Sequence, residues 1–173
     1  MRGMSRDKCG ATGVAGFFKT LAILKPEHVN ATAYLGFVRN SVGSDCYVSD
    51  EIIVSRAGVR VLVGNTDAEG RMVMTDLLAK CKEEAATLGS SVSSVDGSAP
   101  ARIFTVATLT GHAVRCVGPY ACILDNGPAR EAGIAPRVAK AGHLFADPME
   151  VTSLRKEDYS VSFSSFIKQI LTR

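Results

Sequence analysis

Hydrophobic positions recur at helical spacing in two long stretches of the chain. Between residues 9 and 25 they fall three or four positions apart, and Pro26 follows as a helix-ending residue: Val14, Phe17, Phe18, Leu21 and Leu24. The second stretch runs from Met72 to Leu88 and has the same period: Met74, Leu77, Leu78, Cys81, Ala85 and Leu88. The pattern predicts two amphipathic helices, the second of which ends at Gly89, a residue type favoured at helix ends.

Short apolar runs predict the strands. Residues 31–38 and 102–109 are each eight residues long and mostly apolar, which is typical of buried strands. Residues 52–63 contain two apolar runs around Ala57-Gly58 and predict a hairpin whose second arm is at least half buried, through Val59, Val61 and Val63. With the helix between them, hairpin and strand indicate a βαβ unit with a right-handed connection. The predicted fold class is α/β, a mixed, mainly parallel sheet flanked by helices.

The remaining segments are less regular. Residues 90–101 are rich in serine and predict a surface loop, and residues 111–136 carry Gly and Pro at intervals that suit short elements and turns. Near the C-terminus, apolar residues at helical spacing predict an amphipathic helix: Phe163, Phe166, Ile167, Ile170 and Leu171. That helix can pack on the domain, bind a partner or stay frayed.

Composition narrows the classes of partner. The 173 residues are 46% hydrophobic, enough for one compact domain or a large piece of a bigger one. Lys and Arg total 20 against 17 Asp and Glu, with no basic block, and only 6% of residues are aromatic, so neither nucleic acid nor a membrane is expected as a partner. Five widely spaced cysteines predict free thiols in a reducing compartment. The apolar stretch from Val14 to Leu24 contains Lys19 and is too short to span a bilayer, so we expect a cytoplasmic protein.

The strongest chemical pattern is NTDAEGR, from Asn65 to Arg71. It lies where a predicted strand ends and a helix begins, the edge at which open α/β sheets bind ligands. Asp67 and Glu69 point to the same side of an extended backbone, where their charges repel unless a cation lies between them. A capped turn is the other interpretation: Asp67 caps the following helix and Glu69 bonds to Arg71. The spacing alone leaves both open.

Several segments together resemble one family. Residues 65–71 are similar to the NTDAEGR signature of the leucine (cytosol) aminopeptidases, which are two-metal exopeptidases. Residues 4–11 resemble the family's M-x-x-D-x-G-A segment. Residues 108–111 resemble its TLTG segment, and residues 154–159 resemble a later stretch of the family sequence. The resemblance implies that residues 1–160 are a partial aminopeptidase catalytic domain and that residues 161–173 are a divergent helical tail.

The resemblance also implies roles for particular residues. Asp7, Asp67 and Glu69 match metal ligands, and Arg71 matches a catalytic arginine that holds a bicarbonate ion as proton acceptor. The substrate-binding positions are Met4, Thr108, Leu109 and Gly111. The implied cofactors are two divalent cations, Mn²⁺ or Zn²⁺ with Mg²⁺ as a further candidate, and carboxylate oxygens suit such ions. The implied partners are a peptide substrate and further copies of the chain in a homo-hexamer.

Two hypotheses about function follow from this resemblance. One is a two-metal aminopeptidase that removes N-terminal residues from peptides. The family's remaining metal-binding lysine and aspartate, and its catalytic lysine, precede the segment matching Met4, so we expect little peptidase activity from these 173 residues alone. The alternative is therefore a catalytically impaired fragment that acts only as an assembly or interaction subunit.

Two smaller patterns have structural interpretations. Gly10, Gly13 and Gly16 are spaced like a phosphate-binding loop, but no strand precedes them, so we expect close helix packing and disfavour a nucleotide-binding module. A cluster of charged residues in the second predicted helix is expected to form a solvated face: Lys80, Lys82, Glu83 and Glu84.

Overall fold

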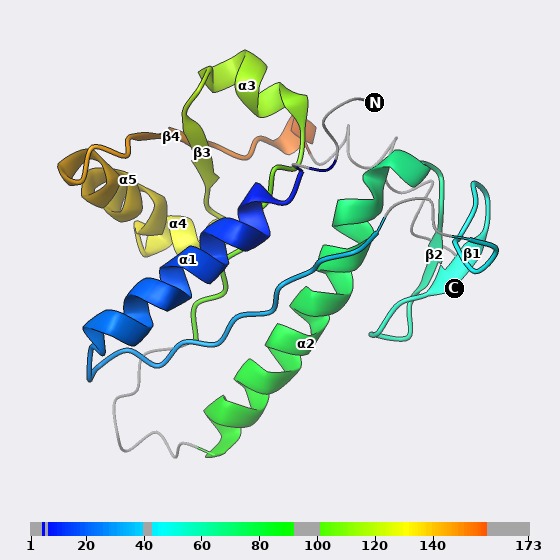
Figure 1. The fold of residues 1–173 in the computed structure, drawn as a ribbon, viewed down its shortest axis with the longest axis horizontal. Coiled ribbons are helices and arrows are strands. Elements are labelled where there is room, and N and C mark those ends of the chain that lie inside the picture. The colour runs from blue at the N-terminus through cyan, green and yellow to red at the C-terminus, as the bar shows by residue number, and fades with distance from the viewer. Residues whose placement is uncertain (1–4, 6, 40–42, 92–100, 159–173) are drawn as a thin grey trace. The chain divides into compact units, whose positions relative to one another are not determined.

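A computed structural model describes residues 5, 7–39, 43–91 and 101–158 of the chain (Figure 1). The fold is mixed α/β, with helices and small sheets that include a parallel pair, as predicted. The described residues divide into two compact units, one up to Leu109 and one from Thr110 onward. The predicted boundary at residue 160 stays a prediction.

The first predicted helix is confirmed as α1, Cys9–Leu24. It ends at Lys25, which adopts a left-handed conformation with φ of 43° and donates its backbone N–H to the Leu21 carbonyl at 2.8 Å. Pro26 comes next and cannot continue the helical hydrogen bonds. The helix therefore ends where the sequence pattern places its end.

The predicted hairpin is also confirmed. Strands β1 (Ile52–Val54) and β2 (Arg60–Leu62) pair antiparallel, with Ile53 opposite Val61, and Gly58 in the turn has a positive φ of 75°. Val61 and Val63 are buried, and Val63 is only 1% exposed. Val59, next to the turn, is 48% exposed, so the burial of this arm increases from the turn toward Val63.

A short 3₁₀ turn, η2 (Thr66–Ala68), leads into α2 (Glu69–Ser91). This helix begins three residues before the predicted start and continues through Gly89, so the predicted end at Gly89 is wrong. A glycine ends a helix when it takes the left-handed conformation at its end. Inside a helix a glycine lowers helix stability by only about 1 kcal/mol relative to alanine, and favourable neighbouring residues can offset this loss.

The two predicted buried strands, residues 31–38 and 102–109, are not strands in the structure. A strand needs a hydrogen-bonded neighbour, and neither segment pairs with one among the described residues. Segment 31–38 instead lies beside α2, where a Cβ built on Gly36 would come within 2.9 Å of Val73 Cγ1. Large apolar side chains of both segments remain exposed: Leu35, Phe37, Val38, Ile103, Phe104, Val106 and Leu109.

The second unit contains the parallel pair. Its elements are α3 (Gly111–Val117), β3 (Ala121–Leu124), α4 (Gly127–Glu131), α5 (Ile134–Leu144) and β4 (Met149–Thr152). Strands β3 and β4 pair in parallel, with Ala121 opposite Met149, and α5 packs against both strands. A strand–helix–strand unit thus forms in a region where the sequence predicted only short elements.

Several predictions concern residues beyond the described parts of the chain. The C-terminal helix lies outside the described residues, as do residues 92–100 of the predicted serine-rich loop. All five cysteines are free thiols, as predicted. Among the described residues, no helix combines the length and the apolar character that crossing a membrane requires.

Candidate active site

The NTDAEGR segment forms a capped junction between β2 and α2. Asn65 has extended backbone angles, and its side-chain Oδ1 accepts the Asp67 backbone N–H at 2.9 Å. Asn65 is therefore the cap, and the alternative in which Asp67 caps the helix is wrong. Because an amide oxygen satisfies the orphan N–H at the start of the turn, the Asp67 carboxylate is left for another role.

Both acidic side chains of the junction are accessible. Asp67 is exposed and Glu69 is half-buried. Neither carboxylate accepts a hydrogen bond or forms an ion pair with another described residue, so the predicted Glu69–Arg71 bond does not form there. Arg71 lies half-buried in the first turn of α2. Carboxylates that are accessible in this way can bind a cation without first losing a partner from the described part of the chain.

Tyr47 lies near this junction and was not predicted as a site residue. Burial raises the pKa of Tyr47 above its ordinary value, and the nearby Glu69 carboxylate adds to the rise. The negative charge opposes ionisation of the phenol, so Tyr47 remains neutral and can donate a hydrogen bond. No spacing rule relates Tyr47, in a turn-rich loop, to an acid 22 positions later in the chain.

A second contact joins two of the predicted site residues. The Thr108 hydroxyl donates a hydrogen bond to Asp7 Oδ1, across 101 residues of sequence. Asp7 was predicted as a metal ligand and Thr108 as a substrate-binding residue. Both belong to the unit Met1–Leu109.

The other predicted substrate-binding residues are placed separately. Leu109 follows Thr108 and exposes 52% of its surface. Gly111 begins α3 in the second unit, where the Thr110 hydroxyl caps the helix by accepting the His112 backbone N–H at 3.3 Å. Met4 lies outside the described residues.

The carboxylate donors suit a divalent cation, but they do not form a complete shell in the described part of the chain. There, no three His, Cys, Asp or Glu side chains gather closely enough to hold a metal ion. Asp7 stands just before α1, whereas Asp67 and Glu69 stand at the start of α2. The joint coordination of metal by these three acids stays a prediction.

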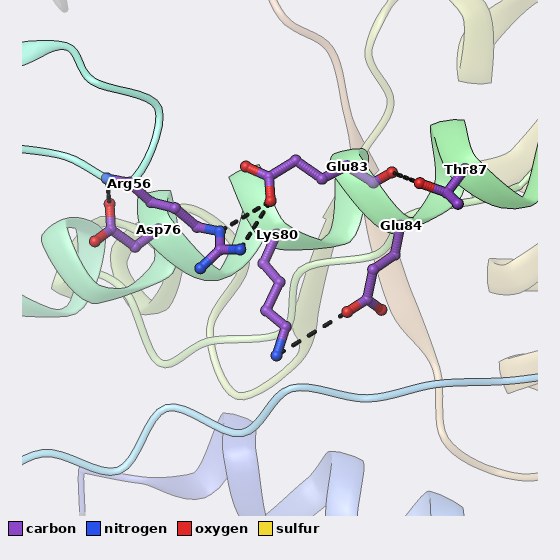
Figure 2. A network of polar contacts seen from close by, with 6 residues as sticks. All are labelled: Arg56, Asp76, Lys80, Glu83, Glu84 and Thr87. Carbon is purple, nitrogen blue, oxygen red and sulfur yellow. Dashed lines mark hydrogen bonds and ion pairs between the residues drawn. The ribbon is translucent and has the colours of Figure 1, made fainter.

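A polar network on α2 anchors neighbouring segments to the helix that begins at the site (Figure 2). The Arg56 guanidinium donates from Nε and Nη2 to Glu83 Oε2 at 3.0 and 2.9 Å, and its backbone N–H donates to Asp76 Oδ1 at 3.0 Å. Lys80 Nζ lies 4.0 Å from a Glu84 oxygen. The hairpin turn is thereby tied to α2. The side chains of Lys80, Glu83 and Glu84 remain 41–52% exposed, so the predicted solvated face also makes contacts with neighbouring segments.

Tyr34 extends this network to segment 31–38. The Lys80 ammonium lies 4.5 Å from the centre of the Tyr34 ring, a cation–π contact. A hydrogen bond to Glu84 raises the pKa of Tyr34 to about 12. Segment 31–38 is therefore held on α2 by side-chain contacts and not by a strand ladder.

The chain is similar to one family of proteins and to curated members of it. The "Cytosol aminopeptidase family, catalytic domain" matches residues 1–170. "Putative aminopeptidase W07G4.4" of Caenorhabditis elegans is 48% identical over 160 residues, 92% of this chain and 29% of the relative. "Probable cytosol aminopeptidase" of Aquifex aeolicus is 31% identical over 159 residues, 91% of this chain and 29% of the relative. "Probable cytosol aminopeptidase" of Persephonella marina is 36% identical over 120 residues, which are 69% of this chain and 21% of the relative. The chain thus spans less than a third of the length of these relatives.

Proposed function

The chain belongs to the cytosol aminopeptidase family, and on that premise we propose that it takes part in metal-dependent removal of N-terminal residues from peptides. One observation carries this proposal. At the β2–α2 junction Asn65 supplies the cap, so that Asp67 and Glu69 keep accessible carboxylates without protein partners among the described residues. The expected extended backbone, with both acids on one side, is wrong, because Asp67 lies in η2 and Glu69 begins α2, and residues two apart on a helix do not face each other. Each carboxylate is still a hard oxygen donor of the kind that divalent cations bind.

In this proposal Asp67 and Glu69 bind divalent cations together with Asp7. Mn²⁺ or Zn²⁺ suits these oxygens, and Mg²⁺ is a further candidate. When bound, the two ions supply Lewis-acid polarisation of the substrate carbonyl and activation of the attacking water. The protein's own part is to hold the acids in place on η2 and α2, and the α2 network keeps that helix anchored.

Arg71 is the proposed catalytic residue that holds bicarbonate as a proton acceptor. Its guanidinium belongs to the first turn of α2, where backbone N–H groups and the helix dipole also favour an anion. An arginine fork can bind a planar oxyanion through two hydrogen bonds. In this proposal bicarbonate, and not the guanidinium of Arg71, takes up the proton from the attacking water.

The remaining roles concern the substrate and the assembly. Met4, Thr108 and Leu109 are proposed to bind the first side chain of the peptide, and Gly111 keeps its substrate-binding role as a proposal from the family resemblance alone. The exposed apolar Leu109 supports a pocket that prefers apolar side chains. We also infer a cytoplasmic homo-hexamer, which the free cysteines and the exposed apolar side chains of segments 31–38 and 102–109 support.

A second candidate function is an assembly or interaction subunit without turnover of its own. Segments 31–38 and 102–109 favour it, because they combine extended backbone, exposed apolar side chains and no strand partner among the described residues. The described part of the chain also lacks a three-ligand metal group.

Hydrolysis of a chromogenic leucine amide, measured with and without Mn²⁺, separates the two functions. Turnover by the 173-residue chain that requires Mn²⁺ and is lost in Glu69→Gln supports the aminopeptidase. Mn²⁺ binding by calorimetry without turnover supports the interaction subunit. A chain that neither binds Mn²⁺ nor turns over the amide contradicts the proposed metal site.

A further inference from the structure

The hydrogen bond between Thr108 and Asp7 is a contact between a neutral donor and a charged acceptor. The Thr108 hydroxyl donates its single proton to Asp7 Oδ1, and both side chains are exposed. Such bonds are shorter and stronger than those between two neutral groups. The bond restricts rotation of the carboxylate and leaves the lone pairs of Oδ2 for a cation.

A backbone contact next to this bond fixes the two segments against each other. Gly10, three residues after Asp7, is buried in the first turn of α1. A Cβ built on Gly10 would lie 2.5 Å from the Val106 carbonyl oxygen and 2.6 Å from Ala107 Cα. Positions 106 and 107 directly precede Thr108. The absence of a side chain at position 10 is therefore what allows the Thr108 segment to approach Asp7.

Neighbouring glycines and threonines do not make the contacts that Gly10 and Thr108 make. A Cβ built on Gly13 or Gly16 would meet nothing within 4 Å, so close packing is confirmed at Gly10 alone among the three spaced glycines. The neighbouring Thr110 has a different task, because its hydroxyl caps α3. Thr108 and Thr110 are thus not interchangeable.

We propose that Thr108 is a positioning residue whose hydroxyl holds the Asp7 carboxylate, through Oδ1, in the orientation that binds a divalent cation. This inference rests on the proposed function, since it takes Asp7 as a metal ligand. Partners that hydrogen-bond to metal ligands typically contribute about 10- to 100-fold in metal affinity. A neutral hydroxyl is well suited to this task, because it orients the acid without competing with the ion for its charge.

The test measures Mn²⁺ affinity, from the electron paramagnetic resonance signal of free Mn²⁺, for the full 173-residue chain and its variants. Thr108→Val is expected to weaken binding about 10-fold, and Thr108→Ser, which restores the hydroxyl, to stay within about twofold of wild type. Thr20→Val is the matched control, because the Thr20 hydroxyl bonds to the Gly16 carbonyl of its own helix at 3.1 Å. In an Asp7→Asn background, Thr108→Val should have no further effect.

The outcomes separate this inference from the proposed function. If wild type binds Mn²⁺ and Asp7→Asn weakens it but Thr108→Val does not, the positioning role is refuted and the metal site stands. Equal losses in Thr108→Val and Thr108→Ser, or an undiminished effect of Thr108→Val in the Asp7→Asn background, also refute it. If wild type binds no Mn²⁺, the metal site fails and the inference fails with it.

Discussion

Two junctions of the molecule have the same local design and hold an acid in opposite ways. In the first, Asn65 caps the turn between β2 and α2, and Asp67 is exposed. In the second, Asn126 caps α4 after β3 by accepting the Ala129 backbone N–H at 3.0 Å, and the adjacent Asp125 is 8% exposed. In both, an asparagine performs the capping and an acid stands one or two positions away.

The difference lies in what the freed carboxylate meets. Both Asp125 oxygens accept the Ala135 backbone N–H, at 2.9 and 3.1 Å, in the first turn of α5. There the negative charge also faces the favourable end of a helix dipole. The Asp67 carboxylate has no such donor among the described residues. A buried acid with backbone donors serves the fold, whereas an exposed acid without them is available to a ligand.

The largest expected effect is the gain in stability on binding Mn²⁺, which should depend on Asp67 and not on Asp125. At Mn²⁺ concentrations of 100 times the dissociation constant, binding stabilises the folded chain by about 2.7 kcal/mol. Asp67→Ala or Glu69→Ala should abolish that gain, and Asp125→Asn should keep it. Thermal unfolding followed by circular dichroism, with and without Mn²⁺, measures the shift in midpoint. Asp45→Ala, in an exposed loop, is a further control. Equal Mn²⁺-induced shifts of the unfolding midpoint in wild type and both site variants would contradict metal binding by Asp67 and Glu69.

The next largest effect is on the free energy of unfolding in the absence of metal, which should depend on Asp125 and not on Asp67. Asp125→Ala leaves the Ala135 N–H without its acceptor in a buried place, which should lower the free energy of unfolding by about 2 kcal/mol. Asp67→Ala, at an exposed position, should change it by less than about 0.5 kcal/mol. Urea titration measures both values. Asp125→Asn retains one acceptor oxygen and should fall between them; losses of the same size at Asp67 and Asp125 would contradict the assignment.

The smallest expected effect concerns the anchoring of α2, on which the first junction depends. Because the folded-state pKa of Tyr34 is raised from 10.0 to about 12, its hydrogen bond to Glu84 contributes fully below pH 10 and is lost as the pH rises toward 12. The stability difference between wild type and Tyr34→Phe should therefore shrink across that interval. Urea titrations from pH 8 to 11.5, with tyrosinate absorbance recorded in parallel, measure it; a pH-independent difference would show that the bond does not hold the segment.

Local patterns predicted the elements that need no distant partner. Helix α1 has its own apolar period and its own terminating proline, and the β1–β2 hairpin contains both of its strands and its turn. Segments 31–38 and 102–109 have the composition of strands. A strand also needs a neighbouring strand to pair with, and the local composition contains no information about that partner. The β3–β4 pair was missed because its strands are four residues each, shorter than the patterns that signal a strand.

The site shows the same division. The NTDAEGR segment identified the junction and its acids, and the resemblance supplied their roles. The sequence did not indicate that Asn65 rather than Asp67 forms the cap, because both residue types are good caps and lie two positions apart. Nor could spacing predict the bond between Thr108 and Asp7, or the approach of Tyr47 to Glu69, since each joins segments that only the folded chain brings together.

The exposed side chains of Ile103, Phe104 and Val106 have a practical consequence for handling the protein. An extended, apolar stretch offers its backbone to other molecules and promotes aggregation in concentrated samples. With an isoelectric point near 8.6, the chain has little net charge to oppose this in mildly alkaline buffers. Purification near pH 6.5 at moderate protein concentration, where the molecules repel each other more strongly, is therefore the better way to prepare the protein.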